Sequence, residues 1–163
     1  MYRCALLLIP LLLVATVGQA AEPVTIGVAE LGFLDGTGAP VKHQKETEAA
    51  RAKKFTAALR KDLGADGKFK IVELDCGKDP CSIANQAPEE LIAAAKKAGA
   101  QVLIYGGVHE MTPAQNLQAQ ALDIEAAKLV FDQSITITGD AKSWQRAERD
   151  LAEALLKASL EPK

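Results

Sequence analysis

The segment at residues 102–108 constrains the fold of this chain most, because its sequence, VLIYGGV, carries no charged side chain. A strand that is apolar on both faces belongs inside a sheet that other elements cover on both sides. Residues 24–33 have the same character. In that predicted strand one face holds Val24, Ile26 and Val28, and the other holds Ala29, Leu31 and Phe33. The sequence therefore predicts a sheet with covered central strands.

The remaining elements follow from periodicity and from helix and turn signals. A helix is predicted at residues 45–63, where Ala52, Phe55, Leu59 and Leu63 form one apolar stripe. Strands are predicted at residues 68–74, 115–124 and 129–138, a second helix from Pro88 to Gly99, and a last helix after Asp140. The order β-α-β-α-β-β-β-α predicts a single α/β domain with a mixed β-sheet and helices covering the sheet.

The last strand and helix have predicted faces of their own. In the strand, Leu129, Phe131, Ile135 and Ile137 share one face, and Val130, Asp132, Ser134, Thr136 and Thr138 share the wetter one. The predicted seam of the helix consists of Trp144, Ala147, Leu151, Ala154 and Ala158. We expect one of the last three strands to form an edge of the sheet, where a partner strand can pair.

The N-terminus has the form of a secretory signal. Arg3 precedes an apolar stretch, and Gly18-Gln19-Ala20 forms a small-residue cleavage site. We therefore expect residues 1–20 to be a signal peptide and residues 21–163 to form one periplasmic domain, with no membrane span in the mature protein.

Two cysteines remain after the expected cleavage, Cys76 and Cys81. In an oxidising compartment this pair is expected to form a disulfide that staples its loop. A disulfide oxidoreductase remains an alternative, although such enzymes usually separate their cysteines by two residues at the start of a helix.

Composition and motifs exclude some functions and leave others open. A net charge of −2 and an aromatic content of 4% argue against nucleic-acid binding. The serines lie in no strand-to-helix elbow, and the histidines lie in no catalytic motif. We therefore expect a protein that is not an enzyme. A hydrolase that uses Glu30 and His109 is the less favoured alternative.

A further alternative is a binding site at the carboxyl ends of the parallel strands, where ligands gather in open α/β sheets. The first strand carries Glu30 and leads into Asp35, and the third leads into His109 and Glu110. These four residues form a candidate metal set, since carboxylates and an imidazole ligate cations. We expect no cofactor unless this set holds a divalent or trivalent cation.

The chain also resembles a known family. The segments that carry the resemblance are VTIGVAELGF, LRKDLGADGKFKIVELD, LDCGKDPCS, KKAGAQVLIYGGVHEM, LDIEAAKLVFDQSITITGD and WQRAERDLAEALL. Together they resemble the secreted bacterial domain-of-unknown-function family two-three-eight-zero over nearly all of the mature chain, including that family's cysteine loop.

In layout the chain is also similar to the N-terminal domain of TolB and to CsgG-like periplasmic domains. It departs from them in the last hairpin, where Ala126 and Ala127 stand in place of the usual Thr-Gly. The resemblance implies an envelope location and a non-enzymatic interaction or assembly role, and it supplies no catalytic residues. The expected partner is an envelope protein or a second copy of the chain, bound through a sheet edge.

Overall fold

The computed structural model describes residues 22–35, 37, 39, 46–110 and 114–160. The elements, in chain order, are β1 (Val24–Val28), β2 (Gly32–Leu34), α1 (Glu46–Ala65), β3 (Phe69–Val72), α2 (Pro88–Lys97), β4 (Val102–Glu110), β5 (Gln115–Asp123), β6 (Lys128–Ile137) and α3 (Ala141–Lys157). They form a single mixed α/β domain, as the sequence predicts. Among the described residues, no helix is long and apolar enough to cross a membrane.

All six strands belong to one sheet, whose main path runs β3-β1-β4-β5-β6. β1 pairs in parallel with both β3 and β4, and β2 continues this line by pairing in parallel with the far half of β4. β4, β5 and β6 form an antiparallel meander. The predicted central position of the VLIYGGV strand is confirmed, because β4 lies between β1 and β5.

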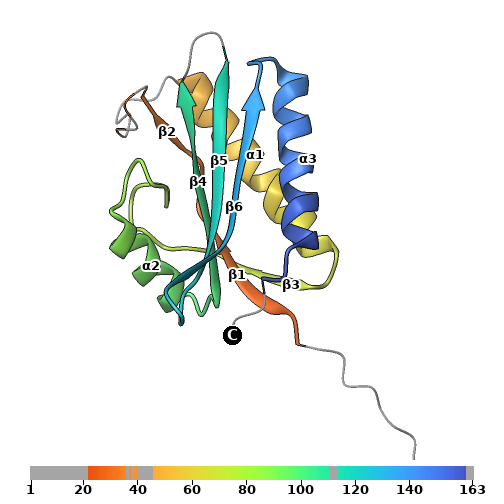
Figure 1. Cartoon of the computed structure of the whole chain (residues 1–163). Helices are drawn as coiled ribbons and strands as arrows, with labels where there is room; N and C mark the ends of the chain where they lie inside the picture. The colour runs from red at the N-terminus through yellow and green to blue at the C-terminus, as the bar shows by residue number, and fades with distance from the viewer. Residues whose placement is uncertain (1–21, 36, 38, 40–45, 111–113, 161–163) are drawn as a thin grey trace, which may run out of the picture.

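Helices cover the two faces of the sheet unequally. α1 and α3 pack side by side on one face, and α2 packs on the other, near the end where β1 and β4 meet (Figure 1). The main core lies under α1 and α3, and a smaller one lies under α2. The predicted stripe of α1 is confirmed, since all four of its members are buried. Among the described elements, no helix lies over the face of β5 and β6 that points away from α1 and α3 (Figure 1).

One predicted strand is in fact two. Residues 24–33 break into β1 and β2, and Glu30 in the break forms an isolated bridge with Ser82. The irregular residues shift the alternation, so that Leu31 and Phe33 enter the same core as Val28. The expectation that they face away from Val28 is therefore wrong, because strict alternation holds only along an unbroken strand.

A β-bulge changes the predicted faces of the last strand. Ala121 pairs with Phe131 but Leu122 pairs with Leu129, which leaves Val130 as an extra residue in β6. Val130 and Phe131 both pack against the main core, whereas Leu129 is 40% exposed. The prediction that Leu129 lies on the core face is therefore wrong.

The last helix begins as predicted. The Asp140 carboxylate accepts a hydrogen bond from the Ser143 N–H at 2.6 Å, which satisfies one of the free amides of the first turn. Trp144, Ala147 and Leu151 are buried, as the seam predicts. In the C-terminal half of the helix the buried residues are Ala152 and Leu155 instead of the predicted Ala154 and Ala158. Glu148 is also buried.

Candidate functional site

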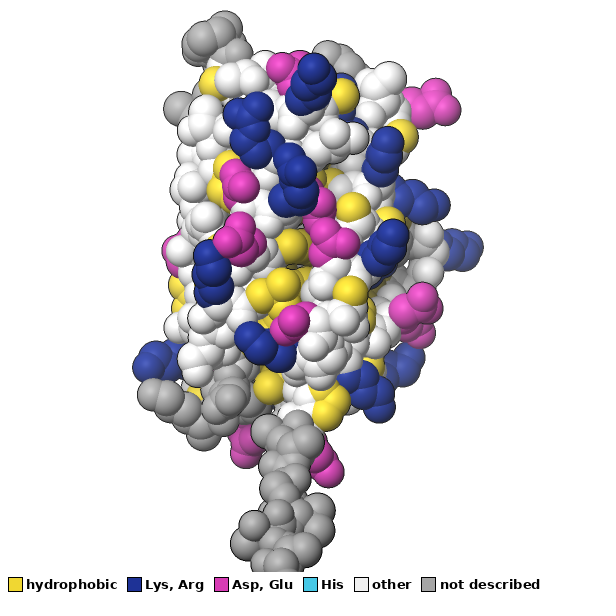
Figure 2. Space-filling view, turned by 90° about the vertical axis from the view of Figure 1, so that its right-hand side faces the viewer, with side chains coloured by type: hydrophobic (Ala, Val, Ile, Leu, Met, Phe, Trp, Pro, Cys, Tyr) yellow, Lys and Arg dark blue, Asp and Glu magenta, His cyan; other side chains and the backbone are white. Residues whose placement is uncertain are grey.

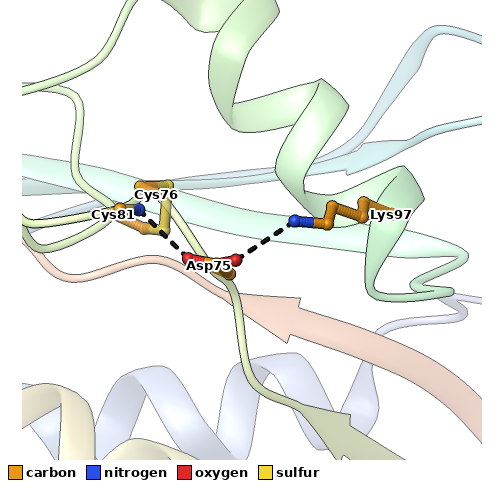
Figure 3. Close-up of polar contacts among 5 residues, drawn as sticks. Asp75, Cys76, Cys81 and Lys97 are labelled. Atoms are coloured by element: carbon orange, nitrogen blue, oxygen red, sulfur yellow. Dashed lines mark hydrogen bonds and ion pairs between the residues drawn. A yellow bond between two sulfur atoms is a disulfide. The ribbon is translucent and has the colours of Figure 1, made fainter.

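The disulfide loop lies at the carboxyl ends of β1 and β3. Cys76 and Cys81 form the predicted disulfide (Figure 3). The loop is attached to the sheet through Glu30, whose N–H donates to the Cys81 carbonyl at 2.7 Å. The disulfide therefore fixes the segment that pairs with Glu30 at the break between β1 and β2.

Asp75 joins this loop to α2. Its carboxylate accepts hydrogen bonds from the Gly77 N–H and from the Lys97 ammonium, each at 3.1 Å (Figure 3). These two bonds, the one from Gly77 first, lower the pKa of Asp75 below its usual value. Because Asp75 and Lys97 are both exposed, the pair orients the loop more than it stabilises the fold.

Glu30 itself is half-buried and lines a hollow of about 260 Å³ beside the disulfide loop. Arg60 of α1 lines the same hollow and donates from its guanidinium to the Val28 carbonyl at 2.6 Å. Sequence reasoning did not find Arg60, because no local signal connects a helix residue to a strand carbonyl so far back in the chain.

The other predicted metal ligands lie elsewhere. The Asp35 carboxylate accepts hydrogen bonds from Thr37 and from the Ala39 N–H within a turn. His109 pairs with Leu34 and Glu110 ends β4, so both lie near Asp35 at one end of the sheet.

Glu30 lies four residues before Leu34, which corresponds to about 13 Å along a strand. Within the part of the chain that the structure describes, no three His, Cys, Asp or Glu side chains are grouped so that they could hold a metal ion. The four-residue metal set and the Glu30–His109 hydrolase pair remain predictions that no described contact supports.

The face of β4, β5 and β6 that points away from α1 and α3 carries a set of polar side chains, and α2 packs against this face at β4. We call it the polar sheet face; its members are Tyr105, Asn116, Gln118, Gln120, Asp132, Ser134 and Thr136, which the strand register places on one side. Leu117, Ala119 and Ala121 alternate with the members on β5 and point into the main core.

Hydrogen bonds connect neighbouring strands across this face. The Asp132 carboxylate accepts from the side-chain amides of Gln118 and Gln120 at 3.3 and 3.2 Å, and the Ser134 hydroxyl donates to the Asn116 side chain at 2.7 Å. The pKa of Tyr105 is raised, first by burial of its phenol and second by the negative charge of Asp132. The face offers amide, hydroxyl and carboxylate groups.

β6 is the edge that sequence reasoning predicted among the last three strands. In the described part of the chain it pairs only with β5, so the other side of this ten-residue strand is unpaired. Asp132, Ser134 and Thr136 are exposed along it. A long edge of this kind presents a row of backbone donors and acceptors that can pair with another strand.

These features define the class of protein, a small mixed α/β domain with a long free sheet edge beside a polar face. The chain belongs to the family described as "Protein of unknown function (DUF2380)", whose model matches residues 24–156. This confirms the resemblance that the sequence carries. No curated protein matched the chain.

Solved structures share the fold. The LpoB C-terminal domain from Salmonella enterica is 17% identical with a TM-score of 0.52, over 74% of this chain and 87% of that one. A PelC dodecamer from Paraburkholderia phytofirmans is 16% identical with a TM-score of 0.52, over 83% and 88%. TolB from Acinetobacter baumannii is 13% identical with a TM-score of 0.53, over 85% of this chain but only 29% of TolB. At these identities the likeness is one of fold.

Proposed function

We propose that this protein is a non-catalytic assembly module of the bacterial envelope, which adds a strand of a second copy of itself along β6. The observation that carries the proposal is the free edge of β6, ten residues long and next to the polar sheet face. Strand addition at such an edge supplies backbone hydrogen bonds, and the flanking side chains supply specificity.

Two further observations support the proposal. One of the proteins that share the fold, PelC, forms a dodecamer, so this kind of domain is compatible with self-assembly. The N-terminal segment has the form of an export signal, which favours the envelope as the location. Within β6 there is no proline, and its one lysine is at its start, Lys128; the bulge at Val130 and the charge of Asp132 leave residues 133–137 as the regular, uncharged part of the edge.

The test uses charge on the edge. A Ser134→Lys/Thr136→Lys double variant places two cations along β6, where they repel an incoming copy that carries the same pair. Glu125→Lys is the matched control, because it changes the net charge by the same amount at the exposed turn between β5 and β6. Each protein is purified from the periplasm, and its association is measured by sedimentation velocity over a range of concentrations. Mass spectrometry of the intact protein shows whether the chain is cleaved after Ala20.

We expect the wild type and Glu125→Lys to associate as concentration rises and the double variant to stay monomeric. A wild type that remains monomeric, or a double variant that associates as well as the control, would count against assembly through β6. Cross-linking from Ser134 in cells distinguishes the two possible partners. A cross-link to a second copy supports the proposal, and a cross-link to a different envelope protein instead identifies that protein as the partner.

A further inference from the structure

A groove between α1 and α3 lies on the helix-covered side of the molecule, away from the polar sheet face. We call it the helix groove. It measures about 600 Å³, which is within the range of small-molecule sites in proteins. In Figure 2 hydrophobic side chains are visible on this side of the molecule between charged ones. Ala50, Phe55, Ala58 and Trp144 supply its apolar lining.

The charges around the groove are mostly positive. Arg51, Lys54 and Lys61 of α1 and Arg149 of α3 line it. They are opposed by two carboxylates, Asp62 and Glu148. The chain as a whole carries a net charge of −2, so this surplus of cations is local and not a reflection of composition. Clustered cations around an apolar lining complement a ligand with an acidic group at one end.

Trp144 links the apolar lining to the charges. Its ring contacts Phe55 edge-to-face at 5.8 Å, and the Arg51 guanidinium carbon lies 5.5 Å from its centroid. Arg51 is thus held at the end of the apolar surface, and Lys54, three residues on, shares that side of α1.

The lining also contains polar atoms without a partner. Trp144 and Glu148 are 4% and 7% exposed, and neither the indole N–H nor the Glu148 Oε1 has a hydrogen-bond partner among the described residues. Buried polar atoms of this kind cost free energy unless a further group pairs with them. Trp144 and Glu148 both line the helix groove, and these two atoms are themselves buried beneath its surface.

We propose that the helix groove binds a small anionic amphiphile, with its acidic head group at Arg51 and Lys54 and its apolar chain along Phe55 and Ala58. The ligand class is a free carboxylate or phosphate ester with an alkyl chain. This role is distinct from assembly through β6, because the groove is lined by α1 and α3 and not by the strand edge, although α3 packs against β6.

The chain provides its own reporter, because Trp144 is its only tryptophan. Decanoate and decanol have the same alkyl chain and differ in the head group, so they serve as the charged probe and its neutral counterpart. We expect decanoate to change the emission of Trp144 in a saturable way and to bind about tenfold more tightly than decanol. Calorimetry on the same samples measures binding without relying on fluorescence.

Variants separate the groove from the rest of the surface. Arg51→Gln/Lys54→Gln is expected to weaken decanoate binding about tenfold, and Ala58→Leu to weaken it by filling the groove without changing a charge. Lys53→Gln is the control, because Lys53 is exposed on α1 but does not line the groove. Circular dichroism establishes that each variant is folded.

Three results would overturn the proposal. The first is the absence of decanoate binding up to about 1 mM. The second is equal binding of decanoate by Arg51→Gln/Lys54→Gln and by Lys53→Gln. The third is binding to phosphatidylglycerol vesicles without binding of free decanoate, which would indicate electrostatic attraction to a membrane surface instead of a ligand site.

Discussion

Ala127, in the turn between β5 and β6, has a left-handed backbone conformation with a φ of 50°. An alanine there carries a steric cost that glycine avoids. We expect Ala127→Gly to raise the free energy of unfolding by about 0.5–1 kcal/mol, measured by urea denaturation. Ala126→Gly is the control, since Ala126 does not have a positive φ; equal effects of the two variants would contradict this explanation.

Glu148 gives the fold a pH dependence of its own. Its pKa is raised above the usual value, first by burial and then by the charge of Asp62, while Arg149 of α3 acts in the opposite direction. Arg51, Lys54 and Lys61 of α1 also line the groove in which Glu148 lies. The folded protein therefore holds this proton to a higher pH than the unfolded chain does, and the fold loses stability as pH rises between the two pKa values.

Glu148→Gln removes that dependence. We expect the variant to be more stable than the wild type at about pH 7, with the difference shrinking as the pH falls toward about 4. Thermal unfolding at several pH values measures it. Glu153→Gln is the matched control on α3, because Glu153 is exposed and its hydrogen bond from Lys157 lowers its pKa instead. A constant difference between Glu148→Gln and the wild type at every pH would show that the carboxylate does not titrate in this range.

Among the elements, the disulfide loop connects β3 to α2 and fills the gap between β1 and β2. Its ring is small, so closing it in the unfolded chain costs little entropy, and we expect Cys76→Ala/Cys81→Ala to lose about 2 kcal/mol of unfolding free energy in urea. Reductant should bring the wild type to the same value and leave the variant unchanged. If the reduced wild type is as stable as the oxidised one, the disulfide does not act as a structural staple.

Periodicity was sufficient to predict the elements, except for the break that divides residues 24–33 into β1 and β2. The alternation in residues 115–123 and the stripe through Phe55 and Leu59 each reflect one buried face, which is a local property of the chain. It failed at Leu31 and Leu129, because a strand break and a bulge each move the alternation by one residue and neither is marked by proline or glycine at that residue. The two-residue alternation of a strand assigns side chains to faces correctly only where no residue is inserted, so it cannot reveal a bulge or a break.

The candidate sites were harder to predict than the fold. The disulfide follows from two cysteines in one loop, and the edge strand follows from three consecutive strands. The metal set assumed that Glu30 lies beside His109, but strand order says little about distance along a strand. The helix groove depends on Arg51 of α1 and Glu148 of α3 facing each other, and only tertiary packing brings those helices together.

For the whole molecule, the two faces of the sheet have different proposed tasks. α1 and α3 bury the main core and form the helix groove, while no described helix lies over the β5 and β6 part of the polar sheet face (Figure 1). A domain that covers only part of its sheet keeps an edge available for a second chain. Assembly through β6 is therefore the central claim about this protein.

Amide hydrogen exchange along β6, measured below and above the concentration at which the protein associates, tests that claim most directly. Alternate amides of β6 bond to β5 and the remaining ones point outward. We predict that association slows exchange at the outward amides of residues 128–137 and that Ser134→Lys/Thr136→Lys abolishes this slowing. Association with unchanged exchange along β6, or with new protection confined to another part of the molecule, would contradict the account.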